Sequence, residues 1–131
     1  MKKFLTVLIL ALFGLGILNA ETIAFRANAF CAKEYTYRGW TDWSNWQRCS
    51  IPITIDTTND MIVILSERTQ YYRIVDYTGT YRQNRAQIIE YKFVDQDGDR
   101  GTMLLVQKDT GQSEIYVHFA NVAWGYDVSR L

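Results

Sequence analysis

Residue types that build catalytic and metal sites are scarce in this sequence. Its 131 residues include one histidine, two cysteines and one proline. A nucleophilic triad or dyad would have to use His118, which alternates with the apolar residues Val117 and Phe119 along a β-like run. Zinc would need more ligands than one histidine and two disulfide-bonded cysteines supply. We therefore expect His118 to be structural, with no catalytic residue, no metal site and no cofactor.

An excess of charge of one sign is also absent. The chain has 14 basic and 14 acidic residues, without a basic cluster of the kind that binds nucleic acid. It contains no phosphate-binding glycine loop and no G-x-S-x-G or H-E-x-x-H motif. Its acidic residues mostly fall at turns or alternate out of strands, as on a solvated face. The sequence thus predicts a protein that is not an enzyme and has no nucleic-acid partner.

The one long apolar run lies at the N-terminus. Met1-Lys2-Lys3 precedes FLTVLILALFGLGIL, and Leu18-Asn19-Ala20 has the small residues of a signal cleavage site. The run is short for a membrane helix, and a polar stretch follows it without a stop-transfer charge. We expect a signal peptide, residues 1–20, and an exported, periplasmic or extracellular protein that is not membrane-embedded. Removing 20 of 131 residues leaves 111, with 12 basic and 14 acidic residues, enough for one domain over 21–131.

Helical periodicity, internal repeats and low-complexity segments are missing after residue 20. Apolar and polar residues alternate with a period of two, and turn signals recur about every 8–12 residues. Besides the tryptophan-rich stretch, we expect strands within 22–30, 53–55, 61–65, 69–79, 86–95, 101–108, 113–120 and 122–128. This pattern predicts an all-β antiparallel meander of eight or nine strands in a small closed or nearly closed barrel, since closure removes exposed edges. A β-sandwich is the alternative.

Both cysteines, Cys31 and Cys49, remain after removal of the signal peptide. In an oxidising compartment such a pair predicts one disulfide, with two buried free thiols as the alternative. Closing this loop would stabilise the domain by about 3 kcal/mol on the chain-entropy model.

The cysteine spacing also suggests a hairpin register. If the two cysteines face each other across antiparallel strands, Tyr35 opposes Asn45 and Tyr37 opposes Trp43. The turn then centres on residues 38–41, where Gly39 tolerates a positive φ. A disulfide between more distant strands is equally compatible with the cysteine count.

The loop from Asp95 to Gly101 carries aspartates at alternate positions, Asp95, Asp97 and Asp99. Such spacing is typical of the start of a calcium loop. The sixth position is Arg100 instead of glycine, and the twelfth is Val106 instead of glutamate, so an EF-hand is excluded. A looser calcium site is an alternative, but we expect an ordinary hairpin loop with an Asp-Gly turn.

Aromatic residues are abundant, at 15% of the chain. Tyr37, Trp40, Trp43 and Trp46 are the candidate ligand-binding residues, because indole and phenol groups suit sugars, apolar ligands and protein partners. For any single aromatic residue, packing in the small core is the competing and favoured interpretation. In an extended strand Trp40 and Trp46 would share one face and Trp43 would take the other.

The order GWTDWSNW, QYYRI, VDQDGDRG, IYVHF and WGYDV spans residues 39–128. It resembles a group of small exported proteins of unknown function from gut-dwelling anaerobic bacteria. The resemblance implies a compact all-β, barrel-like domain behind a signal peptide. It carries over no catalytic or binding residue.

Three functions compete at this point. The first is a non-enzymatic binding module for a small apolar or glycan ligand, held in a concave pocket with the three tryptophans at its mouth. The alternative is a protein-interaction protein, such as an inhibitor of a lysozyme-type hydrolase, which inserts loop 38–48 or loop 96–100 into its partner. An enzyme ranks last, because the sequence offers no catalytic constellation.

Overall fold

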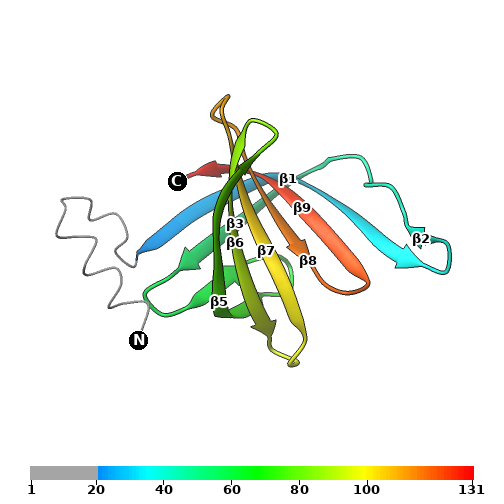
Figure 1. Ribbon diagram of the computed structural model, residues 1–131, viewed down its shortest axis with the longest axis horizontal. Helices are drawn as coiled ribbons and strands as arrows, with labels where there is room; N and C mark the ends of the chain where they lie inside the picture. The colour runs from blue at the N-terminus through cyan, green and yellow to red at the C-terminus, as the bar shows by residue number, and fades with distance from the viewer. Residues whose placement is uncertain (1–20) are drawn as a thin grey trace.

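The computed structural model describes residues 21–131, and the expected signal peptide lies outside the described residues. Residues 21–131 form nine β-strands and no helix, so the all-β prediction is confirmed (Figure 1). The strands are β1 (Thr22–Thr36), β2 (Gly39–Trp40), β3 (Gln47–Asp56), β4 (Met61–Ile64), β5 (Gln70–Gln83), β6 (Ala86–Asp95), β7 (Arg100–Lys108), β8 (Ser113–His118) and β9 (Val122–Arg130). Within this part of the chain no helix has the length and apolar character needed to span a membrane.

Eight of the strands close into a barrel. Each strand from β3 to β8 pairs antiparallel with the next one in sequence, β1 pairs with β3, and β1 also pairs with β9 from Phe25↔Arg130 to Glu34↔Val122. The ninth strand, β2, pairs with β1 alone. The closed antiparallel barrel, and not the β-sandwich, is therefore the fold.

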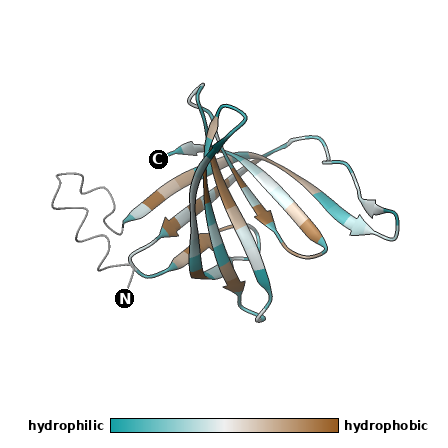
Figure 2. Cartoon of the chain, viewed as in Figure 1, coloured by the Kyte–Doolittle hydropathy of each residue, from teal (hydrophilic) through white to brown (hydrophobic). Residues whose placement is uncertain are grey.

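The barrel interior is filled by side chains. Apolar and polar residues alternate along the strands, which directs one set inward (Figure 2). On the neighbouring strands β5 and β6, Tyr72 stacks on Phe93 with ring centroids 4.3 Å apart, and Phe119 packs edge-on against both. The fully buried core side chains are Phe25, Ile53, Ile55, Ile62, Ile64, Phe93, Met103, Leu105, Ile115 and Val117. The core is thus a packed plug, as expected for a barrel of this size.

Two long strands are bent by β-bulges. The register of β1 shifts between Ala27 and Ala29, and that of β5 shifts between Ile74 and Asp76 and again between Tyr77 and Gly79. Bulges increase local twist and let long strands curve around a small barrel. Beyond the wall, the end of β1 and the short β2 extend away from the barrel, on the side opposite the start of β1 (Figure 1).

Candidate functional site

Residues 33–46, here called the aromatic hairpin, carry a dense set of exposed rings. They comprise the end of β1, the short β2 and the connection toward β3. Exposed fractions run from 38% at Trp43 to 91% at Tyr37, with Tyr35, Trp40 and Trp46 between. Large exposed aromatic side chains gathered in one segment are unusual on a protein surface. Core packing is therefore the wrong interpretation for the three tryptophans, and the four candidate residues lie together on one surface element.

The tip of the hairpin is a two-residue turn at Tyr37 and Arg38. Thr36 pairs with Gly39, whose φ of +100° is one that glycine adopts without strain. The Thr36 hydroxyl donates to the Gly39 carbonyl at 3.0 Å and accepts from the Arg38 amide at 3.1 Å. The tip is thus a narrow, internally bonded turn that exposes one phenol and one guanidinium.

The predicted hairpin register is wrong. Tyr35 pairs with Trp40 instead of Asn45, and the centre of the turn lies about two residues before the predicted one. Residues 41–46 are not a strand, although the Ser44 amide donates to the Ala32 carbonyl at 2.8 Å. Because this stretch is irregular, Trp40 and Trp43 do not alternate between faces as an extended strand would require.

Lys33 holds those two indoles on one side of the hairpin. Its ammonium Nζ lies 5.2 Å from the centroid of Trp40 and 4.5 Å from that of Trp43. Contacts in this range are cation–π interactions worth about 0.5–1 kcal/mol each at exposed sites. Tyr35 adds an edge contact to Trp40 at 5.6 Å between centroids. The result is a self-supporting aromatic surface around one lysine.

Trp43 fixes the hairpin to the outer wall of the barrel. Its ring lies 5.5 Å from that of Tyr116 and 6.4 Å from that of His118, both on β8. Strand β9 lies between β8 and β1 and places Gly125 opposite Tyr116. A Cβ on Gly125 would lie 2.6 Å from the Tyr116 ring. Glycine at this position lets the phenol lie flat against the wall and support the indole.

A buried carboxylate lies below this contact. Glu114 is 8% exposed and accepts hydrogen bonds from the Tyr116 hydroxyl at 2.8 Å and the Lys108 ammonium at 3.2 Å. Burial and the neighbouring Glu114 raise the pKa of the Tyr116 phenol, so it stays protonated as a donor. Glu114 thereby fixes the ring that supports Trp43.

The predicted disulfide is not present, because Cys31 and Cys49 are free thiols. Cys49 packs against the interior core, whereas Cys31 pairs in register with Gly125 and is buried on the outer face beside Tyr116. The barrel wall separates the two side chains, and the pairing of Ala29 with Arg48 places Cys49 beside Asn28, three residues along β1 from Cys31. Burial raises the pKa of both thiols, which makes them poor nucleophiles at neutral pH.

His118 lies on the outer face at the edge of the Trp43 contact. Burial, and secondarily the charge of Lys33, lower the pKa of its imidazole. The side chain therefore packs as a neutral ring beside Trp43. Neither thiol of residues 21–131 has a lowered pKa.

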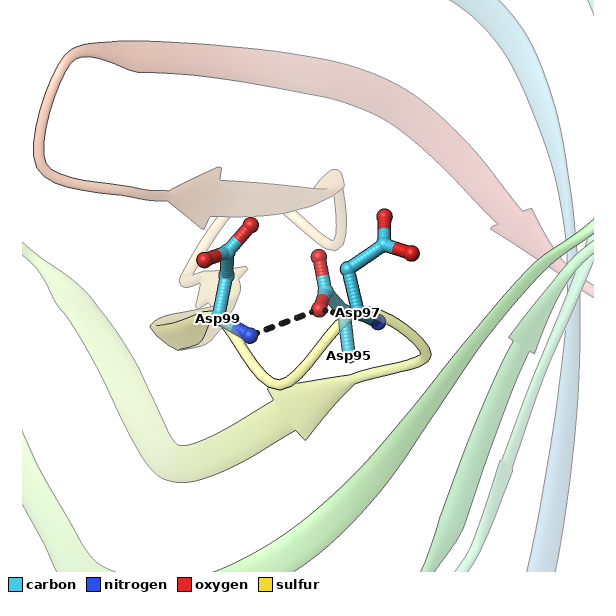
Figure 3. A group of neighbouring side chains, drawn as sticks. All are labelled: Asp95, Asp97 and Asp99. Carbon is cyan, nitrogen blue, oxygen red and sulfur yellow. Dashed lines mark hydrogen bonds between the residues drawn. The ribbon is translucent and has the colours of Figure 1, made fainter.

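The acidic loop brings its three carboxylates together. One oxygen each from Asp95, Asp97 and Asp99 lies within 4.8 Å of the others (Figure 3). The Asp95 carboxylate accepts hydrogen bonds from the amides of Asp97 at 2.9 Å and Asp99 at 2.8 Å, and Gly98 adopts a φ of +87°. These bonds are those of a tight hairpin turn, and they give the Asp95 carboxylate a role in that turn.

Two shallow hollows lie at the end of the barrel beside this loop. Their volumes are about 300 and 560 Å³, and both are lined by Asp95, Phe119 and Trp124. The Nε1 of Trp124 is buried without a hydrogen-bond partner among the described residues, and its ring packs against Phe119 and the core. Neither hollow includes a residue of the aromatic hairpin, so the structure does not place the three tryptophans at the mouth of a pocket.

Sequence inspection missed several residues that build this site. Lys33, Tyr35, Tyr116, Glu114 and Gly125 lie far apart in sequence, and their roles depend on contacts between β1, β8 and β9. A glycine within the strand run WGYDV was one available signal, since such glycines often mark a close approach.

The chain is thus a small filled β-barrel that carries a wall-anchored aromatic hairpin. No protein-family model matches it, and no curated protein matches it. Its function is therefore inferred from the geometry of the hairpin and the barrel.

Proposed function

We propose that the protein is a non-enzymatic protein-recognition module whose binding element is the aromatic hairpin. One observation carries the proposal: five exposed aromatic side chains project from a closed barrel on a hairpin anchored by Trp43. Tryptophan, tyrosine and arginine are the residues that dominate binding energy at protein interfaces. This hairpin presents all three types.

Anchoring lowers the cost of binding. Ordering a rotamer-rich side chain at an interface costs about 0.5–1.5 kcal/mol. Lys33 already orders Trp40 and Trp43, and Tyr116 supports Trp43 from below. The surface is therefore organised before a partner arrives.

The shape of the site favours a protein over a small molecule. The barrel core is filled, so an enclosed apolar ligand has no cavity within the described residues. Sugar rings stack on flat aromatic platforms, yet the planes of Tyr35 and Trp40 cross at 68°. A convex, projecting hairpin instead complements a cleft in another protein.

A hydrolase of the lysozyme type is the partner class we propose. Such enzymes have a cleft with a pair of carboxylates. The hairpin tip is narrow, and Arg38 lies over the ring of Tyr37 with its guanidinium carbon 5.3 Å from the centroid. A guanidinium on an aromatic ring is suited to enter such a cleft and pair with a carboxylate.

Binding and inhibition assays test the proposal. We expect the protein to bind a lysozyme-type enzyme and slow its hydrolysis of cell walls, and we expect Tyr37→Ala and Arg38→Ala to reduce both effects at least tenfold. Tyr71→Ala is the matched control, because Tyr71 is a 45% exposed tyrosine on β5, outside the hairpin. Affinity capture from envelope extracts covers other protein partners. A set of captured partners that is unchanged by Trp40→Ala combined with Tyr37→Ala would reject the hairpin as the binding element.

The hollows at the barrel end support a second candidate, a small glycan ligand. Phe119 and Trp124 supply apolar ring surface there, and Asp95, Gln70 and Asn121 supply hydrogen-bonding groups. Titration with chito- and cello-oligosaccharides, followed by backbone amide NMR shifts, is the test. Shifts confined to residues 66–72 and 119–124 would support this site, and shifts in residues 33–46 would place the ligand on the hairpin.

A further inference from the structure

A second cluster of buried residues lies on the outer wall of the barrel, beneath the aromatic hairpin. In β9 the side chain of Trp124 packs against the core, so its neighbours Ala123 and Gly125 face outward. Ala123 is nevertheless fully buried and Cys31 is 3% exposed, although neither belongs to the interior core. A group outside the wall therefore covers this part of the sheet.

That group is the indole of Trp43. In the register of the sheet, Ala123 lies between His118 of β8 and Lys33 of β1. The centroid of the Trp43 ring is 4.5 Å from the Lys33 ammonium and 6.4 Å from the centroid of the His118 imidazole. The indole therefore spans Ala123, with a cation on one side and the histidine on the other.

The row of residues that contains His118 is rich in positive charge. On its other side the row continues to Thr102 of β7 and Lys92 of β6. The Lys92 ammonium donates to the Thr102 hydroxyl at 3.1 Å and pairs with Glu90 at 3.5 Å. The imidazole thus lies between two lysines of the row, with the uncharged Thr102 and Ala123 as its direct neighbours.

No carboxylate near this row compensates a charge on His118. The hairpin contains two acids, Glu34 and Asp42, and within residues 21–131 neither forms an ion pair with the imidazole or with the hairpin lysine. On β8 itself the carboxylate of Glu114 accepts its hydrogen bond from the Tyr116 hydroxyl. A proton on the imidazole therefore adds a positive charge that has no counter-charge.

We infer that Lys33, Trp43 and His118 form a pH switch, in which protonation of His118 drives Lys33 from the indole and releases Trp43 from the wall. Two cations flanking one indole repel each other, which weakens the contact that orders the hairpin. Burial of the imidazole, and secondarily the charge of Lys33, lower its pKa in the closed hairpin, so the open hairpin takes up a proton more readily. Acid therefore shifts the population toward the open hairpin.

The consequence is a binding element that is ordered near neutral pH and loosens in acid. The closed hairpin is the form proposed to bind a partner, so release of Trp43 raises the ordering cost of binding. Only this consequence rests on the proposed function, because the switch itself is a property of the free chain. His118 is the only histidine of the 131 residues, which allows a transition in the range of histidine titration to be assigned to it by substitution.

Amide exchange of the free chain, expressed as protection factors between about pH 7.5 and about pH 5, tests the switch. The amides of Thr41 and Ser44 donate to carbonyls of β1 at 2.9 and 2.8 Å, so they report the closed hairpin. We expect both to lose protection severalfold in acid, with a midpoint that matches the NMR titration of the His118 imidazole. The Leu65 amide, bonded to a carbonyl of β3 at 2.9 Å, is the control for global unfolding and should keep its protection.

Variants assign the response to named side chains. His118→Gln keeps a neutral polar side chain, and should hold the protection of Thr41 and Ser44 constant over this pH range. Lys33→Gln should raise the midpoint of the His118 titration and weaken the acid response, because one of its two causes is removed. Lys92→Gln is the matched control: this lysine belongs to the same row but not to the hairpin, so the acid response should remain.

An imidazole that titrates while Thr41 and Ser44 keep their protection would overturn the inference. So would an acid response that persists in His118→Gln, or a loss of protection that Leu65 shares. If His118→Gln does not fold, the wild type decides, and a mismatch between the hairpin midpoint and the imidazole midpoint rejects the switch. The proposed function fails by a different result: partner binding that is unchanged by Tyr37→Ala and Arg38→Ala rejects that function and leaves the switch standing.

Discussion

Gly125 is the position at which a single methyl group tests how the aromatic hairpin is anchored. A Cβ there would lie 2.6 Å from Tyr116 Cε1, 2.8 Å from Tyr116 Cδ1 and 3.3 Å from Cys31 Sγ. The φ of Gly125 is not in the left-handed region, so alanine brings no backbone strain. Gly125→Ala must therefore displace the Tyr116 ring from the wall.

The cost has two sources. Overpacking a tightly packed site typically costs about 1–3 kcal/mol. A displaced Tyr116 also gives up its 2.8 Å hydrogen bond to the buried Glu114, which adds about 1 kcal/mol. We expect the free energy of unfolding to fall by about 2–4 kcal/mol. With an m-value of about 2 kcal/mol/M, the urea midpoint falls by about 1–2 M.

Urea unfolding followed by tryptophan fluorescence measures this loss, and the folded variant should emit at longer wavelength because Trp43 loses its support. A double-mutant cycle with Tyr116→Ala tests the cause, since the added methyl should cost little once the ring is absent. Gly79→Ala is the control: its Cβ meets nothing within 4 Å, so it strains the backbone without changing native emission. If Gly125→Ala cost the same with and without the Tyr116 ring, the proposed anchoring would be refuted.

Three further predictions follow from titration and thiol chemistry. The pKa of His118 is lowered in the folded state, so near the ordinary histidine pKa of 6.5 the unfolded chain binds more protons than the folded chain. The free energy of unfolding should therefore decline as pH falls below about 6.5. In urea midpoints measured against pH, His118→Gln should remove this decline. Hydrogen bonds from Asn59 lower the pKa of Asp56, so Asp56→Ala should reduce stability at neutral pH, and the difference from wild type should shrink as pH falls below 3.8 in thermal melts. In the folded protein we expect the buried Cys31 thiol to react slowly with a thiol reagent. After unfolding in urea without reductant, thiol titration should find two reactive groups per chain. If only background reaction were found after unfolding, the two cysteines would form a disulfide.

The barrel could be predicted because its information is local. Period-two alternation and regularly spaced turn signals mark strands without reference to distant contacts. Closure then followed from the cost of leaving edges open in a short all-β chain. The strand expected over 69–79 extends to Gln83, because bulges near Val75 and Thr78 let pairing with β6 continue where the simple alternation breaks.

The hairpin register could not be predicted because β1 changes partner along its length. Near its end β1 pairs with β2, Tyr35 with Trp40, and closer to its start it pairs with β3, Ala29 with Arg48. Neither register brings Cys31 opposite Cys49, and nothing in the local sequence marks where β1 passes from one partner to the other. The anchor at Tyr116 was equally hidden, since it requires knowing that β8 lies two strands from β1 in the closed barrel.

Closure of the barrel is one reason why we propose the hairpin as the recognition element. A closed, filled barrel pairs most of its backbone and has no interior cavity for a ligand within the described residues, so binding must use its outer surface. The extension of β1 beyond the wall, followed by β2, reopens a short edge and exposes five aromatic rings. Gly125 and Tyr116 then bind one of those rings, Trp43, to the wall, which keeps the rest exposed and ordered. In this proposal the inner faces of β8 and β9 stabilise the core and their outer faces support the binding element, so a change to the outer face of β9 should impair partner binding before it unfolds the core.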